Sequence, residues 1–267
     1  MRTYWILFIL VAGCNQSKNS DEASKTPPAE ASEAAAAPEA AAAPKAKAAA
    51  PKAAATTGLG AERAVKDFTN VQLLGAIDVE ISQGPDFSVH VEASEEEDLP
   101  KVSTIVKAGT LAISCHDPNA KWSECGKVTA RVVLPQLDGI VLSGAGDVKG
   151  MTPFVNKSFA IEMKGAGDID LHLEIAGTLV TSITGSGDVK LSGQGDTMDV
   201  SVAGSGVLRA ASFATREALV AITGSGDVEV DASESLKVEI KGSGDVRYSG
   251  TATLTKSIIG IGAIHKR

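Results

Sequence analysis

Short segments in which apolar and polar residues alternate run through the chain from residue 61 to residue 267. Alternation with a period of two is typical of β-strands that bury one face. No window of ten or more residues in this region has the three-to-four residue apolar spacing of a helix, and Gly or Ser-Gly interrupts the pattern every six to ten residues. We therefore predict an all-β domain over residues 61–267. Clear examples of the alternation are Val79–Ile81, Val89–Val91, Val128–Val133, Val200–Val202 and Val238–Ile240.

A motif close to Gly-Ser-Gly-Asp-Val separates many of these segments. Its successive copies start 21, 20, 19, 20, 18 and 18 residues apart. A near-constant period of this size indicates repeats that stack on one another. We predict a right-handed parallel β-helix (solenoid) built from rungs of 18–21 residues. The copies begin at Gly144, Gly165, Gly185, Gly204, Gly224 and Gly242, and a degraded copy begins at Gly260.

Glycine suits the corner between the two strands of a rung for two reasons. It adopts a positive φ without a Cβ clash, and its missing side chain lets identical corners stack closely. A seven-bladed propeller is a competing architecture, but a blade needs about 40 residues. A sandwich of hairpins is harder to exclude from the strand pattern, yet it does not require the same glycine corner at fixed intervals.

We assign the repeated motif a structural role in the turn. In rungs that are in register, its aspartates form a column, and we expect each carboxylate to cap its own turn through backbone N–H groups. Calcium bound between rungs is the alternative, but Val207 and Ala263 replace the aspartate in two copies. We therefore predict no metal site. The residues with the predicted turn role are Gly144, Gly146, Asp147, Gly165, Gly167, Asp168, Gly185, Gly187, Asp188, Gly204, Gly206, Gly224, Gly226, Asp227, Gly242, Gly244 and Asp245.

Two cysteines, Cys115 and Cys125, bracket a turn-rich segment between two strand-like segments. In an oxidising compartment we expect them to form a disulfide that closes this loop, which stabilises by roughly 2 to 3 kcal/mol. A zinc site that includes His116 is the alternative, but the cysteine spacing is not that of a zinc knuckle and a fourth ligand is missing. Trp122 lies inside the loop and either contacts a partner or covers the stack.

The amino-terminal segment carries a targeting signal. Residues 1–13 hold one early positive charge and an apolar run that is too short to span a bilayer. The run ends in small residues before Cys14, which resembles the bacterial lipoprotein signal, so we predict lipidation of Cys14. By the same resemblance, Asn15 in place of Asp favours the outer membrane. Residues 14–60 are rich in Ala, Pro, Lys, Glu and Ser, and we predict the lipid anchor and a disordered tether there.

Composition excludes several classes of function. The formal net charge is −8, and an acidic head disfavours nucleic acid. The four histidines are scattered singly, and no Walker-type or dinucleotide glycine loop precedes a helix. We therefore predict no enzymatic activity, no cofactor and no nucleic-acid partner. The membrane is the one partner that the sequence names, through Cys14, and the oligomeric state stays open.

The serial Gly-Ser-Gly-Asp-Val steps resemble the head GIN domain family of auto-transporter adhesins. Three further stretches carry the resemblance, which extends over about residues 65 to 267. It implies a β-helix-like stack in a bacterial surface or periplasmic protein, without an established biochemical role. The matching stretches are Phe68–Leu73, Ile77–Gly84 and Leu134–Gly144.

Three functions are compatible with the predicted lipid anchor, the predicted tether and the repeat. We expect a lipid-anchored envelope or cell-surface protein whose rigid head is a non-enzymatic scaffold for binding a protein or a glycan. The first alternative is a polysaccharide-active enzyme, although aromatic residues make up only 4% of the chain and such grooves usually carry aromatic platforms. The second is a structural or regulatory envelope module without a ligand of its own.

Overall fold

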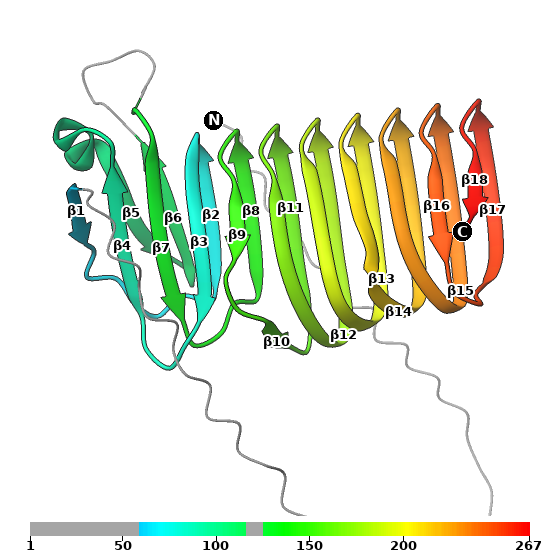
Figure 1. The fold of residues 1–267 in the computed structure, drawn as a ribbon, viewed down its shortest axis with the longest axis horizontal. Coiled ribbons are helices and arrows are strands. Elements are labelled where there is room, and N and C mark those ends of the chain that lie inside the picture. Colours follow the sequence, from blue (N-terminus) through cyan, green and yellow to red (C-terminus); the bar gives the residue numbers. More distant parts are fainter. Residues whose placement is uncertain (1–58, 116–124) are drawn as a thin grey trace, which may run out of the picture. The chain divides into compact units, whose positions relative to one another are not determined.

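A computed structural model describes residues 59–115 and 125–267, which form a β-solenoid with one short 3₁₀ helix (Figure 1). The predicted signal peptide at residues 1–13, the lipidated Cys14 and nearly all of the predicted tether lie outside the described residues. The first strand begins at Leu59, so the last two residues of the predicted tether already pair with the folded domain. The described residues include no helix that is long and apolar enough to cross a bilayer.

The amino-terminal part of the domain forms a cap on the stack. β2 and β3 make the first rung, and β6 and β7 lie parallel to them on the outer side. Antiparallel pairs then close this end, because β4 pairs with β7 and with β1, and β5 pairs with β6. The elements of this part are β1 (Leu59–Glu62), β2 (Asn70–Gly75), β3 (Ile77–Gln83), β4 (Ser88–Ala93), η1 (Glu96–Lys101), β5 (Val102–Lys107), β6 (Thr110–Cys115) and β7 (Val128–Leu134).

The carboxy-terminal part is the repeating stack. Every strand pair from β8 onward is parallel, and each rung pairs with the rungs before and after it in the sequence. The elements are β8 (Gly139–Gly144), β9 (Val148–Gly150), β10 (Phe154–Asn156), β11 (Phe159–Gly165), β12 (Ile169–Gly185), β13 (Asp188–Gly204), β14 (Val207–Gly224), β15 (Asp227–Gly242), β16 (Val246–Ser249), β17 (Thr253–Gly260) and β18 (Ile264–Lys266).

Parallel pairing between successive rungs confirms the all-β solenoid predicted from the period. Propeller blades and hairpin sandwiches join neighbouring strands in antiparallel pairs, so both competing architectures are excluded for the stack. The prediction was incomplete at the amino-terminal end, where β1, β4 and β5 form antiparallel pairs. The alternation of apolar and polar residues is the same in parallel and antiparallel strands, so it did not reveal this cap.

Inward-facing side chains of successive rungs form continuous apolar columns. In β15, Leu236, Val238 and Ile240 are at most 1% exposed, and the equivalent positions of β13 and β14 are also buried. Complete burial of a Leu or Ile side chain stabilises by about 1.5–3 kcal/mol. The core therefore consists of such columns, which extend from the cap along the stack.

One inward position of the core carries a hydroxyl group. Thr181 of β12 is 0% exposed between Leu179 and Ile183, and its Oγ1 has no hydrogen-bond partner among the described residues. An unpaired buried hydroxyl costs about 1–3 kcal/mol. By contrast, the buried Thr215 donates its hydroxyl to the backbone carbonyl of Asp196 at 2.9 Å.

We expect Thr181→Val to raise the free energy of unfolding by about 1 kcal/mol, because valine fills the same space without a polar group. Thr215→Val is the matched control, and we expect it to lower the free energy of unfolding by about the same amount, since it removes a hydrogen bond. Urea denaturation of the two variants and the wild type measures both. Equal destabilisation by the two substitutions would contradict the assignment of Thr181.

Candidate functional site

The first glycines of the motif form one column along the stack. Each of them is the register partner of the next, which confirms that the corners are stacked. The structure adds an eighth member, Gly75 at the end of β2, because it pairs with Gly144. The complete column is Gly75, Gly144, Gly165, Gly185, Gly204, Gly224, Gly242 and Gly260.

The two glycines of a corner are required for different reasons. Gly185 has a φ of 136°, and a Cβ there would also overlap the carbonyl oxygen of Gly165 on the preceding rung. The second glycine, Gly187, lacks a positive φ, but a Cβ would overlap the carbonyl oxygen of Gly167. The first position therefore needs glycine for conformation and for spacing, and the second needs it for spacing alone.

Sequence reasoning missed the copy of the motif in the first rung. Residues 75–79 read Gly-Ala-Ile-Asp-Val, so Ile77 stands where later copies have their second glycine. Ile77 pairs in register with Val128 of β7 on the outer side of the first rung, and not with a glycine of a preceding corner. The signal that could have found this copy was its Gly and Asp at the usual spacing.

The corner aspartates link successive rungs. Asp147 accepts a hydrogen bond at Oδ1 from the backbone N–H of Asp168 at 3.0 Å, and Asp245 accepts one from Ala263 at 2.9 Å. The expectation that each carboxylate caps its own turn was therefore wrong in one respect, because the donor amide belongs to the next rung. The same contact joins Asp78 to Asp147, Asp168 to Asp188, and Asp227 to Asp245.

The column is interrupted where the motif lacks its aspartate. The N–H of Val207 donates to the Gly187 carbonyl at 3.2 Å and not to Asp188. The carboxylate of Asp188 instead pairs with Arg209 at 2.5 Å. This pairing raises the pKa of the Arg209 guanidinium. In the described part of the chain, no three His, Cys, Asp or Glu side chains are grouped so that they could hold a metal ion. The contacts that the corner aspartates make are therefore contacts between neighbouring rungs.

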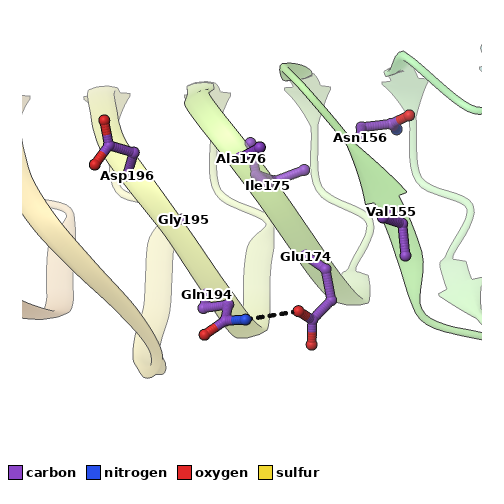
Figure 2. A pocket seen from close by; sticks show the side chains of 8 residues that line it. All are labelled: Val155, Asn156, Glu174, Ile175, Ala176, Gln194, Gly195 and Asp196. Carbon is purple, nitrogen blue, oxygen red and sulfur yellow. Dashed lines mark hydrogen bonds between the residues drawn. The ribbon is translucent and has the colours of Figure 1, made fainter. Parts of the chain in front are cut away.

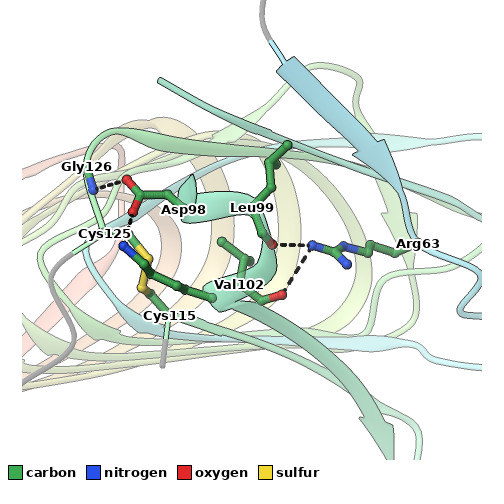
Figure 3. The surroundings of a disulfide bond; sticks show 8 residues. Arg63, Asp98, Leu99, Val102, Cys115, Cys125 and Gly126 are labelled. Carbon is green, nitrogen blue, oxygen red and sulfur yellow. Dashed lines mark hydrogen bonds and ion pairs between the residues drawn. A yellow bond between two sulfur atoms is a disulfide. The ribbon is translucent and has the colours of Figure 1, made fainter. Parts of the chain in front are cut away.

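The predicted disulfide is present at the capped end (Figure 3). The Cα atoms of Cys115 and Cys125 are 6.2 Å apart, and the bond leaves no thiolate for the alternative zinc site. The next residue, Gly126, donates its N–H to the buried Asp98 at 2.7 Å. Lys101 also binds Asp98, and this hydrogen bond, together with that from Gly126, lowers the pKa of the Asp98 carboxyl. The disulfide thus ties the end of β6 to the segment before β7, and the hydrogen bond from Gly126 to Asp98 ties that segment to the 3₁₀ helix η1.

Near the disulfide, Arg63 links the residue that follows β1 to η1 and to the start of β5. Its guanidinium donates to the backbone carbonyls of Leu99 and Val102 at 2.8 and 3.3 Å (Figure 3). Trp122 and His116, which the sequence placed in the disulfide loop, lie outside the described residues.

A groove lies at the bend of the early rungs, and Figure 2 shows part of its lining. It consists of two adjoining pockets of about 340 and 570 Å³, which share Val155, Asn156 and Ala176. We call it the lateral groove. The first pocket is completed by Glu174, Ile175, Gln194, Gly195 and Asp196, and the second by Gln83, Pro135, Gln136, Asp138, Lys157 and Ser158.

An interruption of the repeat produces the lateral groove. β10 is only three residues long and is separated from β11, whereas β12 runs through the bend as one strand of 17 residues. The side chain of Val155 on β10 is 65% exposed, and the pairing of β12 with β13 shifts register after Ile175. The sequence contained a weak signal here, because the segment before β11 has no apolar alternation.

Hydrogen bonds hold the polar walls of the groove. Gln194 donates to Glu174 at 2.8 Å, and Arg216 donates to Asp196 at 2.7 Å. Gln83 accepts a hydrogen bond from the Val155 N–H at 3.1 Å. Since these side chains are already positioned, the groove can bind a partner at a small cost in side-chain entropy.

The structure also brings Ser192, His172 and Glu174 together, a grouping that the sequence did not reveal. His172 Nδ1 lies 2.9 Å from Ser192 Oγ, and Nε2 lies 3.7 Å from Glu174 Oε1. A nucleophilic triad needs a hydrogen bond between the acid and the histidine, and donors for the oxyanion. Glu174 is too distant for that bond, and the strand amides around it pair within the sheet. The three residues therefore form a surface cross-strand cluster.

A capped stack of short parallel rungs, held by glycine corners and grooved on its side, defines a β-solenoid repeat protein. Residues 67–252 match the protein family described as "Putative auto-transporter adhesin, head GIN domain". The match covers well over half of the chain, so the protein belongs to this family, as the sequence resemblance indicated. No curated protein matches the sequence.

Several solved structures have the same fold. A putative adhesin from Bacteroides fragilis NCTC 9343 is 24% identical with a TM-score of 0.74, over 80% of this chain and 98% of that chain. A putative adhesin from Parabacteroides distasonis ATCC 8503 is 23% identical with a TM-score of 0.60, over 78% of this chain and 96% of that one. A putative lipid binding protein from the same organism is 23% identical with a TM-score of 0.62, over 79% and 96%.

The glycine column yields a stability test with a built-in control. We expect Gly185→Ala to lower the free energy of unfolding by more than about 3 kcal/mol, because it adds a backbone overlap to the strain of a positive φ. Gly75→Ala introduces only the strain of a positive φ, since no atom lies within 4 Å of the added Cβ. We expect it to lower the free energy of unfolding by about 1–2 kcal/mol. Urea denaturation measures both, and equal losses would contradict the spacing requirement.

Proposed function

We propose that the protein is a lipid-anchored envelope or cell-surface protein whose β-solenoid head is a rigid, non-enzymatic scaffold for binding a protein or a glycan. The lateral groove carries the proposal, because it is a concave, preorganised surface on an otherwise regular stack. The descriptions of the family and of the Bacteroides fragilis structure as adhesins support an adhesin-like role at the cell surface or envelope.

Three features of the described residues support binding in preference to catalysis. The motif aspartates are engaged in rung-to-rung contacts, and the Ser192–His172–Glu174 cluster lacks the geometry of a triad. The groove itself is lined by amides, carboxylates, apolar side chains, Lys157 and Ser158, with no histidine or cysteine. These groups can donate hydrogen bonds to a bound surface and accept hydrogen bonds from it, and no histidine is there to act as a base for Ser158.

Binding through the lateral groove is tested by filling it. We expect Ala176→Trp to weaken saturable binding of the labelled head to isolated cell envelopes by at least about tenfold, because the indole occupies the part shared by both pockets. Ala203→Trp, at an exposed position of β13 away from the groove, is the matched control and is expected to bind as the wild type does. Protease or periodate treatment of the envelopes then distinguishes a protein partner from a glycan.

Two outcomes would overturn the groove as the recognition site. One is the absence of saturable binding by the wild-type head, and the other is equal binding by the Ala176→Trp and Ala203→Trp variants. Unfolding midpoints of both variants confirm that the comparison is between folded proteins.

The anchor is tested by fractionation of cells that express the full chain. We expect the wild type in the outer-membrane fraction and the Cys14→Ala variant in the soluble fraction, because acyl chains contribute about 0.8 kcal/mol per buried CH₂ to membrane binding. Asn15→Asp is the control, since it keeps the lipid and is expected to change only which membrane is reached. Retention of Cys14→Ala in the membrane would contradict lipid anchoring.

A further inference from the structure

The two ends of the solenoid differ. At one end, β1, β4 and β5 close the stack with antiparallel strands, and at the other end lie β17 and β18 (Figure 1). In the described part of the chain, β17 pairs only with β15, and β18 pairs only with β16. The outer edge of this last rung therefore presents a row of unpaired backbone N–H and C=O groups, which is a template for another strand.

The core is open at the same end. The inward positions Leu254 and Ile258 of β17 pair in register with Leu236 and Ile240 of β15, yet they are only half-buried while their partners are fully buried. Next to the corner, Ile259 and Ile261 are 65% and 86% exposed. A strand added to this edge would bury apolar surface in addition to pairing the backbone.

The position between the two inward apolar residues is a lysine. Lys256 pairs in register with Val238, so it occupies an inward position that is apolar in β13, β14 and β15. Its side chain is exposed, and it has no ion pair among the described residues. An inward-pointing charge on an edge strand is a recognised obstacle to indiscriminate strand pairing.

We propose that β17 and β18 dock a β-strand of a partner protein as one additional rung, and that Lys256 selects a strand with a carboxylate at the facing inward position. The partner strand has the pattern apolar-x-acidic-x-apolar, with its apolar residues over Leu254 and Ile258. Backbone pairing provides affinity in this mode of recognition, and the alternate side chains provide specificity.

Charge complementarity also argues against a second copy of this chain as the occupant. Two-fold pairing of β17 with another β17 would bring two Lys256 ammonium groups to the same part of the core, where like charges are unfavourable. An acidic side chain in the added strand would instead be attracted to Lys256. The proposal is independent of the lateral groove, which lies at the other half of the stack.

A peptide derived from the repeat itself tests the docking. The probe is a fluorescent peptide with the sequence of residues 227–242, the whole of strand β15, carrying either Val238→Glu or Val238→Lys. We expect the folded head to bind the Val238→Glu peptide at least about tenfold more tightly than the Val238→Lys peptide, measured by fluorescence anisotropy. The Lys256→Glu head is expected to reverse this preference.

Lys237→Glu is the matched control, because Lys237 is an exposed lysine of β15 that points away from the core. This head is expected to keep the wild-type preference for the Val238→Glu peptide. The proposal is overturned if neither peptide binds the wild-type head, if both bind equally, or if Lys256→Glu leaves the preference unchanged. Self-association of the wild-type head through this end, detected by sedimentation and abolished by Thr255→Pro, would also overturn it.

Discussion

The contact between glycine corners of successive rungs is the constraint on which the rest of the structure depends. A side chain at the first or second glycine would overlap a carbonyl oxygen of the preceding rung, so the rungs approach to the spacing of a β-ladder only where Cβ is absent. This contact sets the register of every rung. The inward columns of Leu, Val and Ile then align, and the hydrophobic core follows from the corner.

The same register decides what the charged residues can do. The corner carboxylates meet the amides of the next rung, and side-face charges pair between neighbouring rungs, as Lys190 does with Asp170 at 2.9 Å. These groups therefore already make hydrogen bonds or ion pairs within the stack, which a ligand would have to replace. Recognition is left to places where the repeat is interrupted or ends, namely the lateral groove at β10 and the open edge of β17.

The sequence allowed the repeat, its period, the all-β class and the Cys115–Cys125 pairing to be predicted, because each of these is encoded by local residue types at regular spacing. It did not reveal the antiparallel cap or the pairing of Gly75 with Gly144, since these two glycines lie far apart in the sequence. The groove was also missed, because its residues come from five separate segments of the chain and most of them are polar or small. No spacing in the chain marks such a group in advance.

Local geometry explains this division. The sequence by itself determined where the chain turns, because a positive φ and a missing Cβ are properties of single residues. It also determined which faces of the strands are buried, because alternation is a local pattern. Only the tertiary structure decided which rung donates to each aspartate, which end is capped and where Lys256 faces the core. Those features depend on pairing between rungs, and pairing exists only when the stack is assembled.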